Sequence, residues 1–256
     1  LLIKYIYQIV SKYIISIFIL LLTLELNVLA KENSHIDILS ILGPKVSIKT
    51  DWKGRLSVDK SISILVLAGH ADSQGIAGAG TAGEGVDLLG MNPMNQLISD
   101  ELYWNMLIRD EIVRIGKRKG LNINSYDPIE RNIVDGNNPK TNWSKGSLHS
   151  RKGGYAIEIH FDSYGQYGFG SGLIPAFSTE LNTIDESLAN CFGRYPIFFR
   201  GGLGGPRRGI RILEIGKLEG KLEAALRSSD TREIVIKKIA SLVVEAIANG
   251  ISASQS

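Results

Sequence analysis

Four residues in this sequence have the types and the order expected of a metal-dependent hydrolytic site. His70 and His160 lie at the ends of two apolar runs, Glu101 opens a helical stretch, and Glu214 lies inside a third apolar run. Two imidazoles and one carboxylate form a known catalytic zinc shell, in which a water takes the fourth position. A second carboxylate that does not bind the metal could act as the general base. The chemistry that this set favours is hydrolysis of an amide.

Each histidine has a competing interpretation. His70 alone fits a residue that caps a strand as well as it fits a ligand. Two strands that both end in histidine, at His70 and His160, are harder to explain by packing, and ligands of open α/β sheets bind beyond the strand ends. We expect the remaining two, His35 and His149, to be solvated.

Strands and helices that could position these groups are predicted from hydrophobic spacing. Helical periodicity with a basic last turn and a glycine stop predicts a helix at 98–119, and a second amphipathic helix is predicted at 231–249. Short apolar runs predict strands that carry or precede the candidate residues. These runs are 64–67, 121–126, 155–162 and 210–216.

The stretches between these elements predict less regular structure. Residues 36–42 and 46–57 alternate enough for short strands or a hairpin, and 127–153 is predicted as a long polar loop. Gly78–Gly83 matches the spacing of a dinucleotide fingerprint, but no strand ends directly before it and no helix is expected after it. We interpret 71–95 as a mobile loop, and Cys191 as a buried or half-buried spectator in a short helix at 187–192.

Composition limits the function further. The chain has 256 residues, of which 44% are hydrophobic and 21% charged, and a net charge of +3. That charge is too small and too scattered to indicate a nucleic-acid partner, although it is compatible with an anionic polymer. A single cysteine excludes an intrachain disulfide framework and a cysteine-rich zinc site, so any metal must be held by histidines and carboxylates.

The N-terminal residues indicate export. A basic start, an apolar run over 13–24 and a small residue at Ala30 are typical of a secretory signal at 1–30. The alternative is an uncleaved membrane anchor formed by residues 13–30. We expect a linker at 31–44, one catalytic domain at 45–253, and a location in the periplasm or cell envelope.

Short motifs in their order along the chain resemble the zinc-dependent N-acetylmuramoyl-L-alanine amidases of type 3. The resemblance covers about 62–252. Five family motifs occur in order along the chain. The Gly-His motif is matched by Gly69-His70, Glu-x-x-x-Asn by Glu101 with Asn105, and Ile-His-x-Asn/Asp by Ile159-His160-Phe161-Asp162. The Glu-hydrophobic-Gly motif is matched by Glu214-Ile215-Gly216, and Gly-Ile by Gly250-Ile251.

This resemblance implies a fold and a reaction. The fold is α/β, a single domain with a twisted mixed β-sheet flanked by helices and a zinc site at the strand ends. His70, Glu101 and His160 would bind Zn²⁺, and Glu214 would be the catalytic acid and base. The reaction would cleave the amide between N-acetylmuramic acid and L-alanine in peptidoglycan. We expect a monomer whose substrate is a muramyl peptide, and the need for an activator protein stays open.

The sequence also departs from the family at several positions. The usual Gly-His-Gly-Gly is Gly-His-Ala-Asp here, which makes Asp72 a candidate partner of a metal ligand, and Glu158 is a second such candidate. Asp162, Arg207 and Arg208 are further candidates for contact with a ligand or with the substrate. Two rival functions remain: a zinc hydrolase of other envelope substrates, such as a peptidase or deacetylase, and a non-catalytic peptidoglycan-binding protein.

Overall fold

A computed structural model describes residue 16 and residues 36–47, 53–177, 180–196 and 202–253 of the chain. The predicted signal, apart from residue 16, and residues 31–35 of the predicted linker lie outside the described residues. From Ile38 onward the chain forms one compact unit. Among the described residues, no helix is both long and apolar enough to cross a membrane.

Five strands form one mixed sheet in this unit, in the order β2-β1-β3-β5-β4. The first four of these strands run parallel, and β4 pairs antiparallel with β5 at the edge. The expected single-domain α/β fold with a mixed sheet is therefore confirmed. The strands are β1 (Ile64–Ala68), β2 (Ile123–Tyr126), β3 (Tyr155–Asp162), β4 (Gly172–Ile174) and β5 (Ile210–Lys217).

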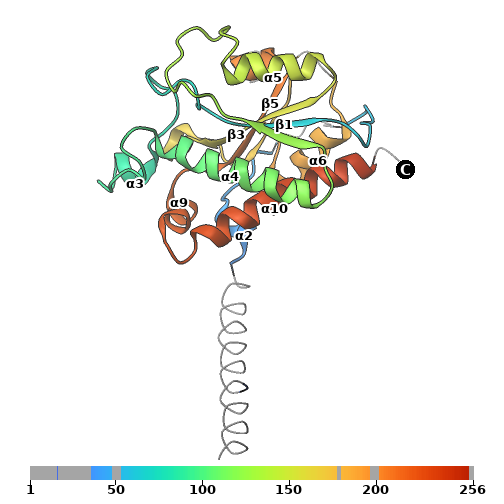
Figure 1. The fold of residues 1–256 in the computed structure, drawn as a ribbon. Coiled ribbons are helices and arrows are strands. Elements are labelled where there is room, and N and C mark those ends of the chain that lie inside the picture. Colours follow the sequence, from blue (N-terminus) through green and yellow to red (C-terminus); the bar gives the residue numbers. More distant parts are fainter. Residues whose placement is uncertain (1–15, 17–35, 48–52, 178–179, 197–201, 254–256) are drawn as a thin grey trace, which may run out of the picture. The chain divides into compact units, whose positions relative to one another are not determined.

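Helices cover both faces of the sheet (Figure 1). α4 (Asp100–Arg118) packs on β1, β2 and β3, and α10 (Arg232–Ala253) packs against α4 and α6 (Thr183–Phe192). On the other face, α5 (Asn142–Arg151) contacts β1, β3 and β5, and α8 (Gly204–Arg207) contacts β5. The shorter segments are α2 (Ile38–Ile41), α3 (Gly83–Asp87), α9 (Gly220–Arg227) and the 3₁₀ turn η1 (Gly165–Tyr167).

The strand at the centre of the sheet, β3, is buried along almost its whole length. Burial on both faces explains why five of its eight residues are apolar. Because β1, β3 and β5 are neighbours and run parallel, their carboxyl ends meet at one edge. That edge receives the residues that follow each strand, which is where the candidate ligands were expected.

The two long helices agree with the prediction. α4 starts after Ser99, whose side chain accepts a hydrogen bond from the backbone of Leu102, and it ends in Lys117 and Arg118. An N-cap serine and a basic last turn satisfy the two helix ends in this way. The cap fixes where the first turn begins and therefore where Glu101 points.

Three predictions about the connecting stretches were wrong. Residues 142–151, expected within a long loop, form α5, which Thr141 caps by accepting a hydrogen bond from Ser144. Residues 38–41, expected as part of a strand, form α2, and 83–87 within the expected loop form α3. The helical pattern of 142–151 is weak because its residues are mostly small and polar, so the contacts of α5 with the sheet decide its structure.

Candidate metal centre

His70 follows β1 in an unusual backbone conformation. The amide of Gly69 donates a hydrogen bond to Ile159 O at 2.8 Å, so the chain still pairs with β3 just before it turns. His70 itself has φ of +62°, the one non-glycine residue with positive φ in the described part of the chain. Such a conformation carries strain that clusters at functional sites. The turn sends the His70 side chain over the end of β3.

Gly69 allows β1 and β3 to approach closely at this point. A Cβ built at Gly69 would lie 2.3 Å from Cε1 of His160. No other residue type fits at this position while His160 keeps its place. The Gly69-His70 pair therefore has two functions in the site. Gly69 leaves room for the imidazole of His160, and His70 supplies the other imidazole.

Glu101 reaches the same place from the first turn of α4. Its side chain is 3% exposed and is held by backbone donors: Thr81 N to Oε2 at 2.8 Å and Phe161 N to Oε1 at 3.2 Å. Burial by itself would raise the pKa of Glu101, but His70, His160 and these hydrogen bonds outweigh burial and lower the pKa. Glu101 is therefore an ionised carboxylate at neutral pH.

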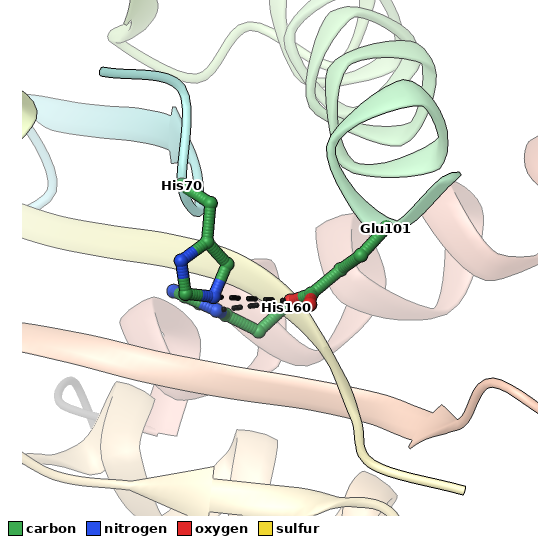
Figure 2. A group of neighbouring side chains, drawn as sticks. All are labelled: His70, Glu101 and His160. Atoms are coloured by element: carbon green, nitrogen blue, oxygen red, sulfur yellow. Dashed lines mark hydrogen bonds and ion pairs between the residues drawn. The ribbon is translucent and has the colours of Figure 1, made fainter. Parts of the chain in front are cut away.

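The three side chains converge (Figure 2). Oε1 of Glu101 lies 3.4 Å from Nε2 of His70 and 3.3 Å from Nδ1 of His160, and one donor atom from each residue lies within 4.8 Å of the others. Ligands at about 2.0–2.1 Å from a tetrahedral zinc ion are separated by about 3.3–3.4 Å. The two distances to Glu101 therefore fit a zinc ion, and these residues could hold one.

The two histidines respond differently to this environment. Burial lowers the pKa of His70. Burial also disfavours charge on His160, but the neighbouring Glu101 and Glu158 carboxylates outweigh it and raise the pKa of His160 well above its ordinary value. The cluster thus favours a positive charge at His160, which a proton supplies in the metal-free protein.

Glu214 lies beside His160 on the sheet. The two residues are register partners of β5 and β3, so their side chains share a face. Oε2 of Glu214 is buried and has no hydrogen-bond partner among the described residues. Burial raises the pKa of Glu214 to about 8, with Glu101 and Asp162 adding to the effect and His160 opposing it. A carboxyl group of this kind can hold a proton near neutral pH.

A cavity of about 300 Å³ opens next to the two histidines. It lies between the loop after β1, the loop before α5, and α8. His70, His160, Asp72 and Glu158 contribute polar side chains to its wall, and most of the rest is apolar. In the described part of the chain, Glu214 is not among the lining residues. The apolar lining residues include Ile76, Ile133, Val134, Trp143, Leu203 and Ile212.

Among the four lesser candidates, the two carboxylates Asp72 and Asp162 hold loops in place through hydrogen bonds. Asp72 accepts a hydrogen bond from the amide of Asn142 at 2.6 Å, which ties the start of α5 to the loop after β1. Asp162 accepts from the Tyr195 hydroxyl at 2.9 Å and from Gly170 N at 2.9 Å. The amide that holds Asp72 is 70 residues away in sequence, whereas the Gly170 amide that holds Asp162 is only 8 residues away.

The two arginine candidates lie on or next to α8. The Arg208 guanidinium lies 4.6 Å from the centre of the Trp143 ring and donates to Asn137 Oδ1 at 3.1 Å and to Gly204 O at 3.2 Å. Arg207 is on the exposed side of the helix. Because Trp143 lines the cavity, Arg208 is in contact with a residue of the cavity wall.

Two expectations about other residues can be scored. His149, expected to be solvated, is partly buried, and its Nε2 lies 2.8 Å from Ser63 O, so that prediction was wrong. Cys191 is half-buried, as expected. Trp143 was missed: a tryptophan in a polar stretch was the available signal, but its place in the cavity wall depends on α5.

Comparisons with known proteins give a likeness of fold. No protein-family model and no curated protein sequence matches the chain. The amidase Ami1 from Mycobacterium smegmatis is 15% identical with a TM-score of 0.50, and the match covers 77% of this chain and all of that one. Cwp6 from Clostridium difficile is 12% identical with a TM-score of 0.50, over 74% of this chain and 29% of its own. At these identities the likeness establishes the fold.

Proposed function

We propose that this chain, whose fold is that of N-acetylmuramoyl-L-alanine amidases, hydrolyses the amide between N-acetylmuramic acid and L-alanine in peptidoglycan. The observation that carries the proposal is the convergence of His70, Glu101 and His160, with donor separations of 3.3 and 3.4 Å that fit zinc. The fold supports the choice of substrate, because the neighbouring structure of Ami1 is named as an amidase of this kind.

In this proposal the three clustered residues hold the ion and Glu214 moves the proton. A bound zinc ion lowers the pKa of a coordinated water and polarises a carbonyl oxygen. Glu214 takes a proton from the attacking water and returns it to the alanine nitrogen as the C–N bond breaks. The products are the lactyl carboxyl group of muramic acid and a free alanine amine.

The protonation of Glu214 suits both halves of this role. Burial raises its pKa to about 8 in the metal-free protein, so the group can carry a proton at neutral pH. Additional positive charge beside His160 lowers that pKa, because opposite charge favours the ionised form. Glu214 would then begin the reaction as a base and finish it as an acid.

The cavity and its rim are proposed to bind the substrate. Its apolar wall, which includes Trp143 and Ile133, would exclude water from the reacting amide. Arg208, whose guanidinium lies over the Trp143 ring, would pair with a carboxylate of the stem peptide. Arg207, on the exposed side of α8, is a weaker candidate for the same contact.

Export and assembly complete the proposal. A substrate in the cell wall requires an enzyme outside the cytoplasm, which agrees with the signal or anchor predicted at 1–30. Peptidoglycan is the proposed partner, and the monomeric state and the need for an activator protein stay predictions.

A product assay tests the reaction. Zinc-loaded protein is incubated with muropeptides of defined structure, and the products are identified by mass spectrometry and by labelling of new amines. We expect a free L-alanine amino terminus and an intact sugar chain. Release of acetate would instead indicate a deacetylase, and a new amine elsewhere in the peptide would indicate a peptidase.

Two variants assign the roles within that assay. Glu214→Gln keeps the size of the side chain and loses its acid–base capacity, so we expect unchanged zinc content with turnover lowered about 100-fold or more. His160→Ala should lose both zinc and turnover. Retention of most activity in Glu214→Gln would show that another group moves the proton.

A further inference from the structure

Glu158 is a buried carboxylate that the proposed reaction does not use. It lies in the middle of β3, two residues before His160 on the same face of the sheet, and it is 3% exposed. Its register partner on β5 is the apolar Ile212. Burying a carboxylate is costly unless a partner compensates the charge. The position of Glu158 therefore requires a partner.

In the part of the chain that the structure describes, the second nitrogen of His160 is such a partner. Oε2 of Glu158 lies 3.6 Å from Nε2 of His160, while Nδ1 on the other side of the ring lies 3.3 Å from Oε1 of Glu101. The imidazole is thus placed between two carboxylates, one for each nitrogen. Among the described residues, Nε2 is buried and makes no hydrogen bond within normal length.

We propose that Glu158 is a positioning residue for His160, an inference that rests on the proposed metal site. If Nδ1 binds the ion, Nε2 must carry the ring proton, because a neutral imidazole has one proton to share between two nitrogens. Glu158 accepts that proton in a hydrogen bond, fixes the tautomer and orients the ring. Carboxylates commonly act on metal-binding histidines in this way.

The surroundings of Glu158 support this role. Gly205 at the start of α8 lies so close that a Cβ there would be 3.2 Å from Oε2 of Glu158. The helix therefore closes over the carboxylate, and the low exposure strengthens its interaction with the imidazole.

A different role for Glu158 is proton transfer to or from the substrate, because it also lines the cavity. The two roles predict different behaviour of glutamine at this position. The amide oxygen of glutamine still accepts a hydrogen bond from Nε2, so it keeps a positioning role, but it cannot act as a base.

Zinc affinity of the full chain separates these roles. We compare Glu158→Gln with Glu158→Leu, since both keep the side-chain volume and only glutamine keeps an acceptor oxygen. The dissociation constant is measured by competition with a chromophoric chelator. We expect zinc affinity about 10- to 100-fold weaker in Glu158→Leu and close to wild type in Glu158→Gln. Ile212→Leu, at the register neighbour, controls for repacking of the cavity wall and should bind zinc as wild type does.

A second measurement reads the tautomer directly. In zinc-loaded wild type and Glu158→Gln, nitrogen-15 NMR should find the His160 proton on Nε2. The proposal is overturned if Glu158→Leu binds zinc as tightly as wild type does. It is also overturned if Ile212→Leu loses as much zinc affinity as Glu158→Leu. If Glu158→Leu does not fold, Glu158→Ala takes its place in the same comparison.

Failure of this inference is distinguishable from failure of the proposed function. Wild type that binds no zinc removes the metal site and the inference together. Wild type that binds zinc but leaves muropeptides intact removes the amidase reaction, while the zinc affinities still decide the role of Glu158. Glu158→Gln that keeps zinc and loses turnover as fully as Glu158→Leu would overturn positioning in favour of proton transfer.

Discussion

His160 is the residue on which the charges of the site converge. Glu101 and Glu158 lie at its two nitrogens, and Glu214 is its neighbour on β5. Three carboxyl groups around two imidazoles give an excess of negative charge, which the metal-free protein offsets by keeping protons on His160 and Glu214. A divalent cation would replace that compensation. This charge balance supports the proposed metal site, which rests on the separations of the donor atoms of His70, Glu101 and His160.

The pH dependence of stability in the metal-free protein tests the environment of Glu214. Its pKa is raised from 4.5 to about 8, so between these pH values the folded state binds a proton that the unfolded state has lost. The stabilising contribution is complete below pH 4.5 and is lost as pH rises to about 8. The Glu214→Gln variant cannot lose this contribution. Its free energy of unfolding relative to wild type should therefore increase steadily as pH rises from 4.5 to about 8.

The measurement is urea unfolding of both proteins with a chelator present, at several pH values between 4.5 and 8. Comparison of the two proteins cancels the titration of shared groups that do not interact with Glu214. The pKa of His160 also falls in the variant, because the Glu214 carboxylate helps to raise it, so the difference between the proteins reports on Glu214 together with its effect on His160. If the free energies of unfolding of the two proteins change with pH in parallel, the Glu214 carboxyl ionises in the folded protein as it does in the unfolded chain.

At the scale of elements, the site depends on how closely three of them approach. β1 and β3 meet where Gly69 bonds to Ile159. From the first turn of α4, Glu101 contacts Phe161 of β3 and His70 just after β1. Asn105, one turn further along α4, donates to Gly69 O at 3.3 Å and so ties the helix to the end of β1. The ligands are therefore held by rigid elements, which favours a fixed donor geometry.

Gly69→Ala should disrupt the site without removing a ligand. The added methyl group would lie 2.3 Å from Cε1 of His160, so either the ring or the strand must move. We expect a loss of zinc affinity of at least about tenfold, the lower end of what misplacing a ligand costs. Gly202→Ala is the control, because a Cβ at Gly202 has no neighbour within 4 Å. Both variants are compared by zinc competition and by circular dichroism. Unchanged affinity in Gly69→Ala would show that the two strands separate easily.

At the scale of the whole molecule, the site exists only in the folded chain. Its four candidate residues are numbered 70, 101, 160 and 214, and long-range strand pairing brings them to one edge. A ligand that binds the folded chain alone stabilises it by an amount set by its concentration relative to its dissociation constant. Zinc should therefore report on folding as well as on catalysis.

Thermal unfolding gives this test. Zinc at about 100 times its dissociation constant should stabilise wild type by about 2.7 kcal/mol and raise the melting temperature, and a chelator should reverse the shift. His160→Ala should not respond to zinc. His149→Ala is the matched control, because His149 bonds Ser63 O outside the cluster and its loss should leave the response intact. A zinc response in His160→Ala equal to wild type would place the binding site elsewhere.

Much of the site could be predicted from the sequence because its signals are local. An apolar run that ends in histidine, a capped helix with an acid in its first turn, and a charge inside a strand are each visible within about ten residues. These signals predicted β1, β3, β5 and α4, together with the positions of the four candidate residues along them. The resemblance to type 3 amidases also implied an α/β fold, and ligands of such folds bind at the edge where the strands end.

Other features were decided by tertiary contacts. α5 was missed because its small polar residues carry a weak helical pattern, and its packing on β1, β3 and β5 stabilises it. The antiparallel strand β4 has three residues, too few for a periodic signal. The partners of Asp72 and Asp162 are amides or hydroxyls that the fold brings near.

His160 shows most clearly what the sequence determines and what the tertiary structure determines. The sequence by itself determined that a histidine closes a buried strand, because eight consecutive residues with apolar alternation specify that strand. The approach of α4 decides that one nitrogen of the ring faces Glu101. The approach of α8 closes over Glu158, the carboxylate beside the other nitrogen. Those approaches are set by packing between distant parts of the chain, so only the tertiary structure decided them.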